Sequence, residues 1–393
     1  MYFHLQANRV SVKASFDGAP EQGVIDFGVG QPSADLLPVD LLRGGSERYF
    51  ASAQALELNY GDKQGDVHFR KALAGFMTGV SGHAATPESL FLSAGNSQAL
   101  DFICQRFTQP GDTVIVEEPS YFLAFRVFHD HGLNIVGIPM DQHGMDIDRF
   151  EQALARHRPR LVYTIPSFHN PTGRTLTGER RERLLALSRE HGFTIVADEV
   201  YQFLHCGEPP PASFGTMIEQ GHVLSLGSFS KILAPSLRLG WIQANADAIR
   251  SMLASGVIIS GGNFNHFTSH VVRQLLEDGS LARHLAHLRS TYAARVEAMD
   301  EALREHLGDW ATWEIPRGGY FFWLTLPQGI NAADLQAAAR QARTGFQPGA
   351  SCSSSGGLHN CLRLSFAHYS VAEIHEGIGR LGKALRVATD SRV

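Results

Sequence analysis

The chain has 393 residues, of which 44% are hydrophobic and 19% are charged, and these values are typical of a globular protein with about two domains. A net charge of −5 gives no reason to expect nucleic acid or an anionic membrane surface as a partner. No apolar run of about 18 residues predicts a membrane span, and the first residues lack the order of a signal peptide. The cysteines are scattered without a Cys-x-x-Cys pair, at Cys104, Cys206, Cys352 and Cys361. We therefore expect a cytoplasmic protein without a disulfide framework or a zinc ribbon.

Helical and strand-like segments alternate along the chain after an irregular, Gly- and Pro-rich stretch that ends near residue 45. Apolar periodicity predicts helices at residues 69–77, 97–107 and 178–191. Short β-branched runs predict buried strands at 113–116, 161–165, 194–197 and 223–226. This alternation predicts an α/β fold with a mostly parallel sheet that helices cover on both faces.

The C-terminal third has the pattern of a second, smaller α/β unit. We expect helices at 281–306, 331–343 and 371–386, with strands at 318–324 and 361–366. The N-terminal segment is expected to pack with this unit. The predicted division is a large domain over residues 46–290 and a small domain made of residues 1–45 with 291–393.

Three polar residues come directly after predicted strands of the large domain. Asn170 follows the strand at 161–165, Asp198 ends the strand at 194–197, and Lys231 follows the strand at 223–226. Ligands of parallel α/β sheets bind beyond the carboxyl ends of the strands. The sequence therefore places a ligand site there.

Lys231 stands in Ser228-Phe229-Ser230-Lys231, seven residues before Arg238. A lysine amine is a nucleophile only when it is neutral, and a desolvated or positively charged pocket favours that state. Ser228, Ser230 and Arg238 have the hydroxyls and the guanidinium that suit a phosphate. Asn96 and Ser97 begin a predicted helix, where a phosphate is also favoured, although an ordinary helix cap is the alternative.

The remaining candidates suit a charged aromatic ring and a carboxylate. Asp198 could pair with a protonated ring nitrogen, and Tyr201 and Asn170 could donate hydrogen bonds to a ring oxygen. Tyr121 could stack on the ring, or it could be a core aromatic residue. Arg363 lies in an apolar strand, where it binds either a substrate carboxylate or an internal acidic partner.

The ordered set of Asn170-Pro171-Thr172-Gly173, Asp198-Glu199-Val200-Tyr201, Ser228-Phe229-Ser230-Lys231 and Arg238 resembles the fold-type I aminotransferases of class I/II, especially the 2-aminoadipate aminotransferase branch. The resemblance implies an aspartate-aminotransferase-like fold and the cofactor pyridoxal 5'-phosphate. It also implies amino transfer between an L-amino acid and a 2-oxo acid by a ping-pong mechanism, through a Schiff base at Lys231.

The same resemblance assigns the other residues. Asp198 holds the ring nitrogen, Asn170 and Tyr201 contact the ring oxygen, and Tyr121 covers the ring. Arg363 binds the substrate carboxylate, with Asn170 and the segment at Gly30 beside the substrate. Tyr60 resembles the tyrosine that reaches the phosphate of a neighbouring subunit, which implies a homodimer with shared active sites. The phosphate contacts fall to Asn96, Ser97, Ser228, Ser230 and Arg238.

Four other functions are compatible with parts of the sequence. The same cofactor supports β- or γ-elimination or oxidation, which pocket details decide. Ser228-Phe229-Ser230-Lys231 is also a Ser-x-x-Lys hydrolase motif, but the elements that should follow it are missing. The pairs His266/His270 and His284/His287 have metal-ligand spacing, although surface or core histidines are expected. A cofactor-binding sensor would need a basic helix-turn-helix segment before this domain, whereas the given sequence begins close to the catalytic unit.

Overall fold

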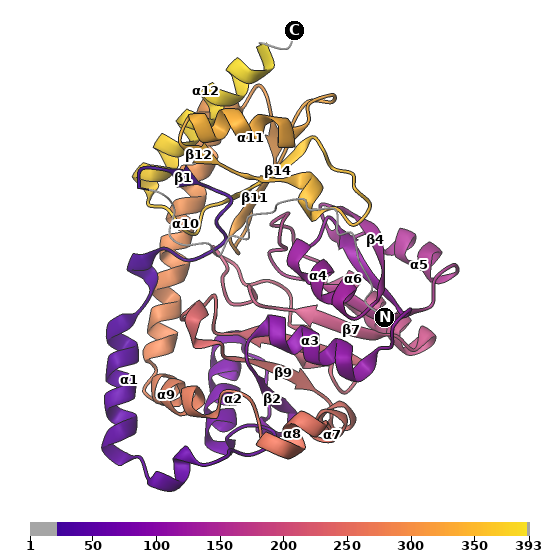
Figure 1. Ribbon diagram of the computed structural model, residues 1–393, viewed down its shortest axis with the longest axis vertical. Helices are drawn as coiled ribbons and strands as arrows, with labels where there is room; N and C mark the ends of the chain where they lie inside the picture. Colours follow the sequence, from indigo (N-terminus) through magenta and orange to yellow (C-terminus); the bar gives the residue numbers. More distant parts are fainter. Residues whose placement is uncertain (1–21, 391–393) are drawn as a thin grey trace, which may run out of the picture.

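The computed structural model describes residues 22–390 of the chain, so residues 1–21 and 391–393 of the predicted small domain lie outside it. Within residues 22–390, the largest sheet has eight strands (Figure 1). Their order across the sheet is β2 (Leu90–Ser93), β9 (Gly240–Ala244), β8 (Val223–Ser228), β7 (Thr194–Asp198), β6 (Pro159–Thr164), β3 (Thr113–Glu118), β4 (Asn134–Asp141) and β5 (Gly144–Met145). Strands β8, β7, β6, β3 and β4 are parallel, while β9 is antiparallel to both of its neighbours. The predicted mostly parallel sheet is confirmed.

Helices cover both faces of this sheet, and this explains why its strands are apolar at nearly every position. Leu161 and Tyr163 of β6 belong to one buried cluster, whereas Val162 between them belongs to the other. A strand that is buried on both faces has no solvent side to make polar. The helices of this part of the chain are α1 (Val39–Ser52), α2 (Val67–Ser81), α3 (Asn96–Phe107), α4 (Phe122–Asp130), α5 (Ile147–Leu154), α6 (Gly178–His191), α7 (Ala246–Leu253), α8 (Gly256–Gly261) and α9 (His266–Glu277).

A smaller antiparallel sheet lies near the top of Figure 1. Its strand order is β10 (Thr312–Trp313), β11 (Phe321–Thr325), β14 (Cys361–Ser365) and β13 (Gln347–Pro348). The short strand β1 (Ile25–Asp26) pairs in parallel with β12 (Thr344–Gly345), which places residues 25–26 beside this unit. The helices of this part are α10 (Ser280–Leu307), α11 (Ala332–Gln341) and α12 (Val371–Asp390).

The expectation of irregular structure up to residue 45 was wrong, because α1 begins at Val39. Gly44 and Gly45 weaken the helical signal of this segment. A Cβ atom at Gly45 would lie only 3.2 Å from both the carbonyl oxygen of Val271 and the side chain of Leu275 in α9. The glycine is therefore needed for close packing of two helices, a requirement that local propensity does not reveal.

The predicted domain division at residues 290 and 291 falls inside the unbroken helix α10, which runs along the left of Figure 1 from the large sheet to the small one. The division stays a proposal. None of the helices within residues 22–390 has the length and apolar character needed to cross a membrane.

Candidate active site

A cavity of about 160 Å³ lies beyond the carboxyl ends of β6, β7 and β8. It is lined by every predicted site residue except Tyr60, namely Gly30, Asn96, Ser97, Tyr121, Asn170, Asp198, Tyr201, Ser228, Ser230, Lys231, Arg238 and Arg363. These residues come from separate strands, helices and loops along the chain. The topology therefore brings together the groups that the sequence separates by up to about 330 positions.

Lys231 lies in the turn after β8, and its side chain extends along the cavity wall. The Nζ atom donates a hydrogen bond to the carbonyl oxygen of Gly30, 2.9 Å away. Burial and, secondarily, the nearby Arg363 guanidinium lower the pKa of Lys231 to about 8, while Asp198 opposes this shift. A substantial fraction of this amine is thus neutral at mildly alkaline pH, as a nucleophile or base requires.

Asp198 ends β7 at the bottom of the cavity. Its carboxylate accepts hydrogen bonds from the Tyr163 hydroxyl at 2.9 Å and from the Asn96 amide at 2.6 Å. Burial raises the pKa of Asp198, and the two hydrogen bonds partly offset that rise. A cation placed against this carboxylate would compensate for its burial, so the position suits a protonated ring nitrogen.

The Asn96 side chain lies against Asp198, to which its amide donates a hydrogen bond. Phosphate contact was expected from the backbone or the side chain of Asn96, and the backbone N–H at the start of α3 is the group left for that contact. Of the pair Asn96-Ser97, the hydroxyl of Ser97 and the N-terminus of α3 remain available to an anion. The N-cap residue of this helix is Gly95, which has no side chain to cap it.

Ser228, Ser230 and Arg238 form the other end of the same cavity. The Ser228 hydroxyl donates to the Ser230 hydroxyl at 2.9 Å, and the Arg238 guanidinium donates to the carbonyl oxygen of Ala94 at 3.2 Å. Gly95 has a φ of +87°, and a Cβ atom there would lie 2.9 Å from the guanidinium. The positive φ favours glycine here, and the missing side chain leaves room for Arg238 at the start of α3, where hydroxyls, a guanidinium and a helix N-terminus suit a phosphate.

Arg363 is buried in the middle of β14. Its two Nη atoms donate to the Asn170 side-chain oxygen at 3.0 Å and to the Gly28 carbonyl at 2.8 Å. The Phe321 ring lies 4.2 Å from the guanidinium carbon, and within residues 22–390 the Nε atom has no hydrogen-bond partner. The acidic partner that was the alternative for Arg363 is not found among those residues. A buried guanidinium with a free Nε atom and no acidic partner among those residues suits an incoming carboxylate.

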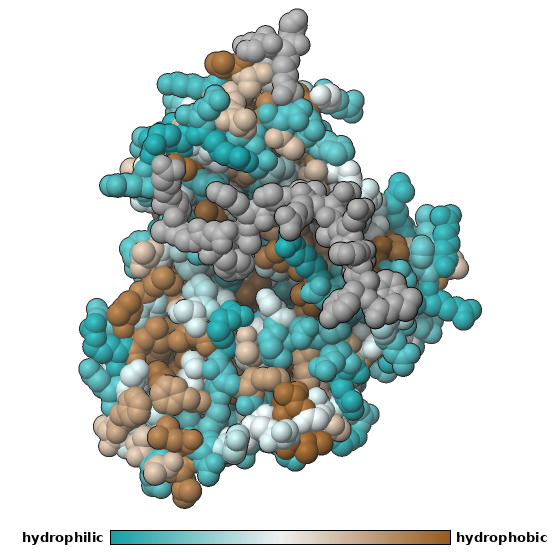
Figure 2. All heavy atoms as spheres, in the orientation of Figure 1, coloured by the Kyte–Doolittle hydropathy of each residue, from teal (hydrophilic) through white to brown (hydrophobic). Residues whose placement is uncertain are grey.

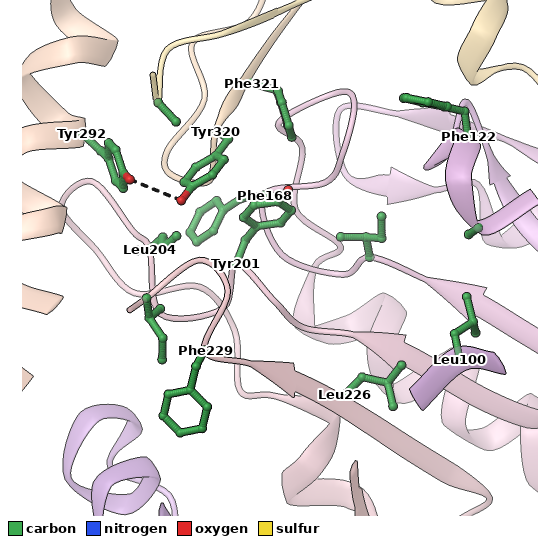
Figure 3. Close-up of a cluster of buried hydrophobic side chains, with 14 of the residues drawn as sticks. Leu100, Phe122, Phe168, Tyr201, Leu204, Leu226, Phe229, Tyr292, Tyr320 and Phe321 are labelled. Carbon is green, nitrogen blue, oxygen red and sulfur yellow. Dashed lines mark hydrogen bonds between the residues drawn. The ribbon is translucent and has the colours of Figure 1, made fainter. Parts of the chain in front are cut away.

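Tyr201 belongs to an aromatic cluster with Tyr320 and Phe321 beside the cavity, which Figure 3 shows. Tyr201 is 3% exposed, and burial raises its pKa. Burial likewise raises the pKa of Tyr121 to about 12. Both phenols are therefore protonated donors at neutral pH. Tyr60, by contrast, is 84% exposed and lies away from the cavity of its own chain.

Sequence reasoning missed Tyr163, which holds Asp198, and Phe321, which supports Arg363. Tyr163 was assigned only to a buried strand, and its polar group within an apolar run was the available signal. Phe321 lies on the same face of the small sheet as Arg363, because Trp323 pairs with Arg363 and alternate residues share a face. The position of Phe321 follows only from the pairing register of β11 and β14, which the sequence does not reveal.

The competing sites are not assembled. Lys231 donates to Gly30 rather than to Ser228, so the Ser-x-x-Lys motif shows no serine–lysine contact. The Nε2 atoms of His266 and His270 lie 3.2 Å apart. Within residues 22–390, no group of three or more His, Cys, Asp or Glu side chains is placed to hold a metal ion.

Comparison with known proteins defines the family. Residues 22–381 match the family described as aminotransferase class I and II. The aromatic-amino-acid aminotransferase 1 of Thermococcus litoralis is 33% identical over 92% of this chain and 88% of its own. The structure of LysN, an α-aminoadipate aminotransferase from Thermus thermophilus complexed with N-(5'-phosphopyridoxyl)-L-leucine, superimposes with a TM-score of 0.86 at 31% identity over 94% of each chain. An uncharacterized HTH-type transcriptional regulator of Bacillus subtilis, YisV, is 29% identical over 97% of this chain and 78% of its own. The chain belongs to the class I and II aminotransferase family.

Proposed function

We propose that this aminotransferase holds pyridoxal 5'-phosphate in the cavity around Lys231 and moves an amino group from an L-amino acid to a 2-oxo acid. The observation that carries the proposal is the common cavity of the Lys231 amine, the Asp198 carboxylate and the Arg363 guanidinium. When bound, the cofactor supplies an electron-withdrawing ring that stabilises negative charge at the substrate Cα.

The two ends of the cavity suit the two ends of this cofactor. Ser97, Ser228, Ser230 and Arg238 would hold the phosphate, together with the N-terminus of α3. Asp198 would face the ring nitrogen, held in place by Tyr163 and Asn96. Tyr201 and Asn170 would donate to the ring oxygen, and Tyr121 would cover one face.

The substrate end of the cavity holds a carboxylate and moves a proton. Arg363 would bind the substrate carboxylate through its Nε and Nη atoms, oriented by Asn170 and Phe321. Lys231 would take a proton from the Cα of the amino donor and pass it to the cofactor, to which the amino group would move. In the second half-reaction it would move a proton in the opposite direction, to the Cα of the new amino acid. A pKa of about 8 suits both steps near neutral pH.

The relatives suggest which donors to test. One relative acts on aromatic amino acids, and another on α-aminoadipate with an L-leucine adduct bound. We propose that an amino acid from these groups is the donor, with a 2-oxo acid as the acceptor.

The decisive experiment is the visible absorbance of the full-length protein with pyridoxal phosphate, before and after a panel of L-amino acids. We expect one donor to shift the band, with formation of its 2-oxo acid, and a 2-oxo acid acceptor to restore it. Release of ammonia instead would indicate that the enzyme catalyses elimination or oxidation rather than amino transfer. The absence of any lysine-dependent band would contradict the proposal itself.

Replacing Arg238 with alanine should weaken cofactor binding about 10- to 150-fold, because a hydrogen bond to a charged group contributes about 1.5–3 kcal/mol. The maximal rate at saturating cofactor should change much less. The measurement is titration of the cofactor-free protein with pyridoxal phosphate. Arg106→Ala is the matched control, because Arg106 lies at the far end of α3, where it donates to Ser251. Equal affinities in Arg238→Ala and wild type would remove Arg238 from the phosphate site.

We also propose a homodimer whose second copy covers an apolar surface around Tyr60. The exposed apolar side chains there lie on α1, the turn that follows it, α8 and α9, and they are Val39, Phe50, Leu56, Leu58, Val257, Ile259 and Phe267. Figure 2 shows apolar residues gathered at the lower end of the molecule, over α1 and α8. Exposed apolar area of this kind favours association with a self-complementary surface.

The homodimer predicts complementation between Lys231→Ala and Tyr60→Ala subunits at a pyridoxal phosphate concentration that saturates the wild type but not Tyr60→Ala. We expect Tyr60 to contact the phosphate in the active site of the neighbouring subunit. A mixed dimer of one Lys231→Ala subunit and one Tyr60→Ala subunit then contains one intact site and one doubly defective site. Random mixing should then restore activity at about a quarter of all sites. The assay is turnover after the two variants are mixed and allowed to exchange subunits. Mixtures no more active than the separate variants would contradict sharing of Tyr60.

A cytoplasmic location is part of the proposal. All four cysteines are free thiols, and three of them are buried. Reduced thiols are typical of a reducing compartment.

A further inference from the structure

The ring of Tyr320, immediately before β11, faces the Lys231 amine. Tyr320 is fully buried, and the Nζ atom of Lys231 lies over its ring, 5.1 Å from the centroid. Figure 3 shows this ring between Tyr292 and Tyr201, with Phe321 next to it. Tyr320 is outside the set of residues assigned to the cofactor and the substrate.

The hydroxyl of Tyr320 contacts the main chain of the same lysine. It donates to the carbonyl oxygen of Lys231 at 3.3 Å and lies 3.3 Å from the Tyr292 hydroxyl, the contact drawn in Figure 3. A consistent arrangement has Tyr292 donating to Tyr320 and Tyr320 donating to the carbonyl. Both distances are longer than most hydroxyl hydrogen bonds. The hydroxyl contacts are therefore weak, and the ring face is the second contact of Tyr320 with Lys231.

An aromatic face attracts an ammonium group most strongly where both are removed from water. The cavity around Lys231 is such a place. The other charged or titratable side chains that line it are Asp198, Arg238, Arg363, Tyr121, Tyr163 and Tyr201. Asp198 favours the protonated amine, and Arg363 disfavours it. The Tyr320 ring adds attraction for the ammonium group. No carboxylate among residues 22–390 forms an ion pair with Lys231 on the side where this ring lies.

We propose that Tyr320 is a positioning residue for Lys231, holding the protonated amine against its ring and the lysine main chain through its hydroxyl. The inference rests on the proposed role of Lys231. Tyr320 also packs against Tyr201, with ring centroids 5.3 Å apart, so a single side chain of the small sheet orients two groups of the cofactor site. Its expected consequence is chemical: Tyr320 sets the pH at which the amine loses its proton.

The test compares rings of nearly equal shape at position 320 in the full-length chain. The variants are Tyr320→Phe and the same position carrying singly fluorinated or trifluorinated phenylalanine, since fluorine withdraws electron density from the ring face. The readout is the pH midpoint of Lys231 modification by an amine-reactive reagent in the cofactor-free protein, measured on the Lys231 peptide by mass spectrometry. Trifluorinated phenylalanine in place of Phe150, buried on the other face of the large sheet, is the control.

We expect Tyr320→Phe to keep a midpoint close to the wild-type value. Trifluorination should lower the midpoint by about half a unit to one and a half units, as loss of a buried cation–π contact implies, and single fluorination should lower it less. The sign follows because a weaker ring face destabilises only the charged amine. The pH dependence of kcat/KM in the cofactor-loaded enzyme should move in the same direction.

A midpoint that stays at the Tyr320→Phe value, or rises, after trifluorination would overturn the role of Tyr320. The labelling experiment needs no cofactor, so it decides this point independently of the enzyme's activity. If the wild-type protein forms no lysine-dependent absorbance band with pyridoxal phosphate, the proposed function fails, whatever the labelling shows. The two ideas can therefore fail separately. Far-UV circular dichroism confirms that each variant is folded, and the singly fluorinated ring provides a second, milder substitution.

Discussion

Replacing Lys231 with alanine is expected to lower kcat by about 10⁴-fold or more and to remove the lysine-dependent visible absorbance of the bound cofactor. The reason is that the change deletes both the nucleophile and the group that moves the Cα proton. The cavity keeps its phosphate contacts and Asp198, so the variant should still bind pyridoxal phosphate. Turnover with a matched donor and acceptor, together with the spectrum, measures the effect.

The control for Lys231→Ala is Lys71→Ala, which removes an exposed lysine on α2 and should leave both readouts unchanged. A small primary amine added to Lys231→Ala should restore part of the activity, because it can take over proton transfer. Such rescue separates loss of the base from loss of the fold. Wild-type turnover in Lys231→Ala would end the proposed mechanism.

Replacing Asp198 with asparagine is the second change with a large expected effect. Asparagine keeps the shape and one acceptor but removes the charge that would pair with the ring nitrogen. Loss of a buried ionic partner costs about 3–5 kcal/mol, which corresponds to about 10²- to 10⁴-fold in kcat. The phosphate end is untouched, so cofactor affinity should fall less than the rate.

Two further measurements sharpen the Asp198 prediction. Tyr163→Phe removes only one hydrogen bond to the carboxylate and keeps its charge, so it should lower kcat less than Asp198→Asn does. A cofactor analogue with a methylated, permanently positive ring nitrogen should recover part of the rate in Asp198→Asn. Equal rates for the natural cofactor in Asp198→Asn and wild type would show that Asp198 does not control the ring.

The strands and the site positions that follow them were predictable because they depend on local pattern and one general rule. Buried strands β3, β6, β7 and β8 are continuous apolar runs, and helix α6 agrees with its predicted limits of Gly178 and His191. Thr177 accepts a hydrogen bond from the backbone of Arg180 at its start, and Gly192 ends it with a φ of +75°. Capping chemistry of this kind is visible in the sequence.

The features that escaped prediction depend on contacts between distant segments. Helix α1 was missed because Gly45 serves packing against α9. The direction of the Asn96 amide depends on Asp198, which is 102 positions away. Tyr320 faces Lys231 only because the residues before β11 lie against the turn after β8. Local propensity carries no information on such pairings, whereas register and packing decide them.

Helix α10 has a mechanical consequence for the way this cavity can change shape. It has 28 residues, hence a length of about 42 Å, and it carries Tyr292 and Arg295, which contact the groups around β11 and β14. A single continuous helix that spans both parts of the chain resists sharp bending, because each intrahelical hydrogen bond would have to lengthen. Rearrangement on substrate binding should therefore be a shallow shear of packed elements along α10 rather than rotation about a flexible hinge.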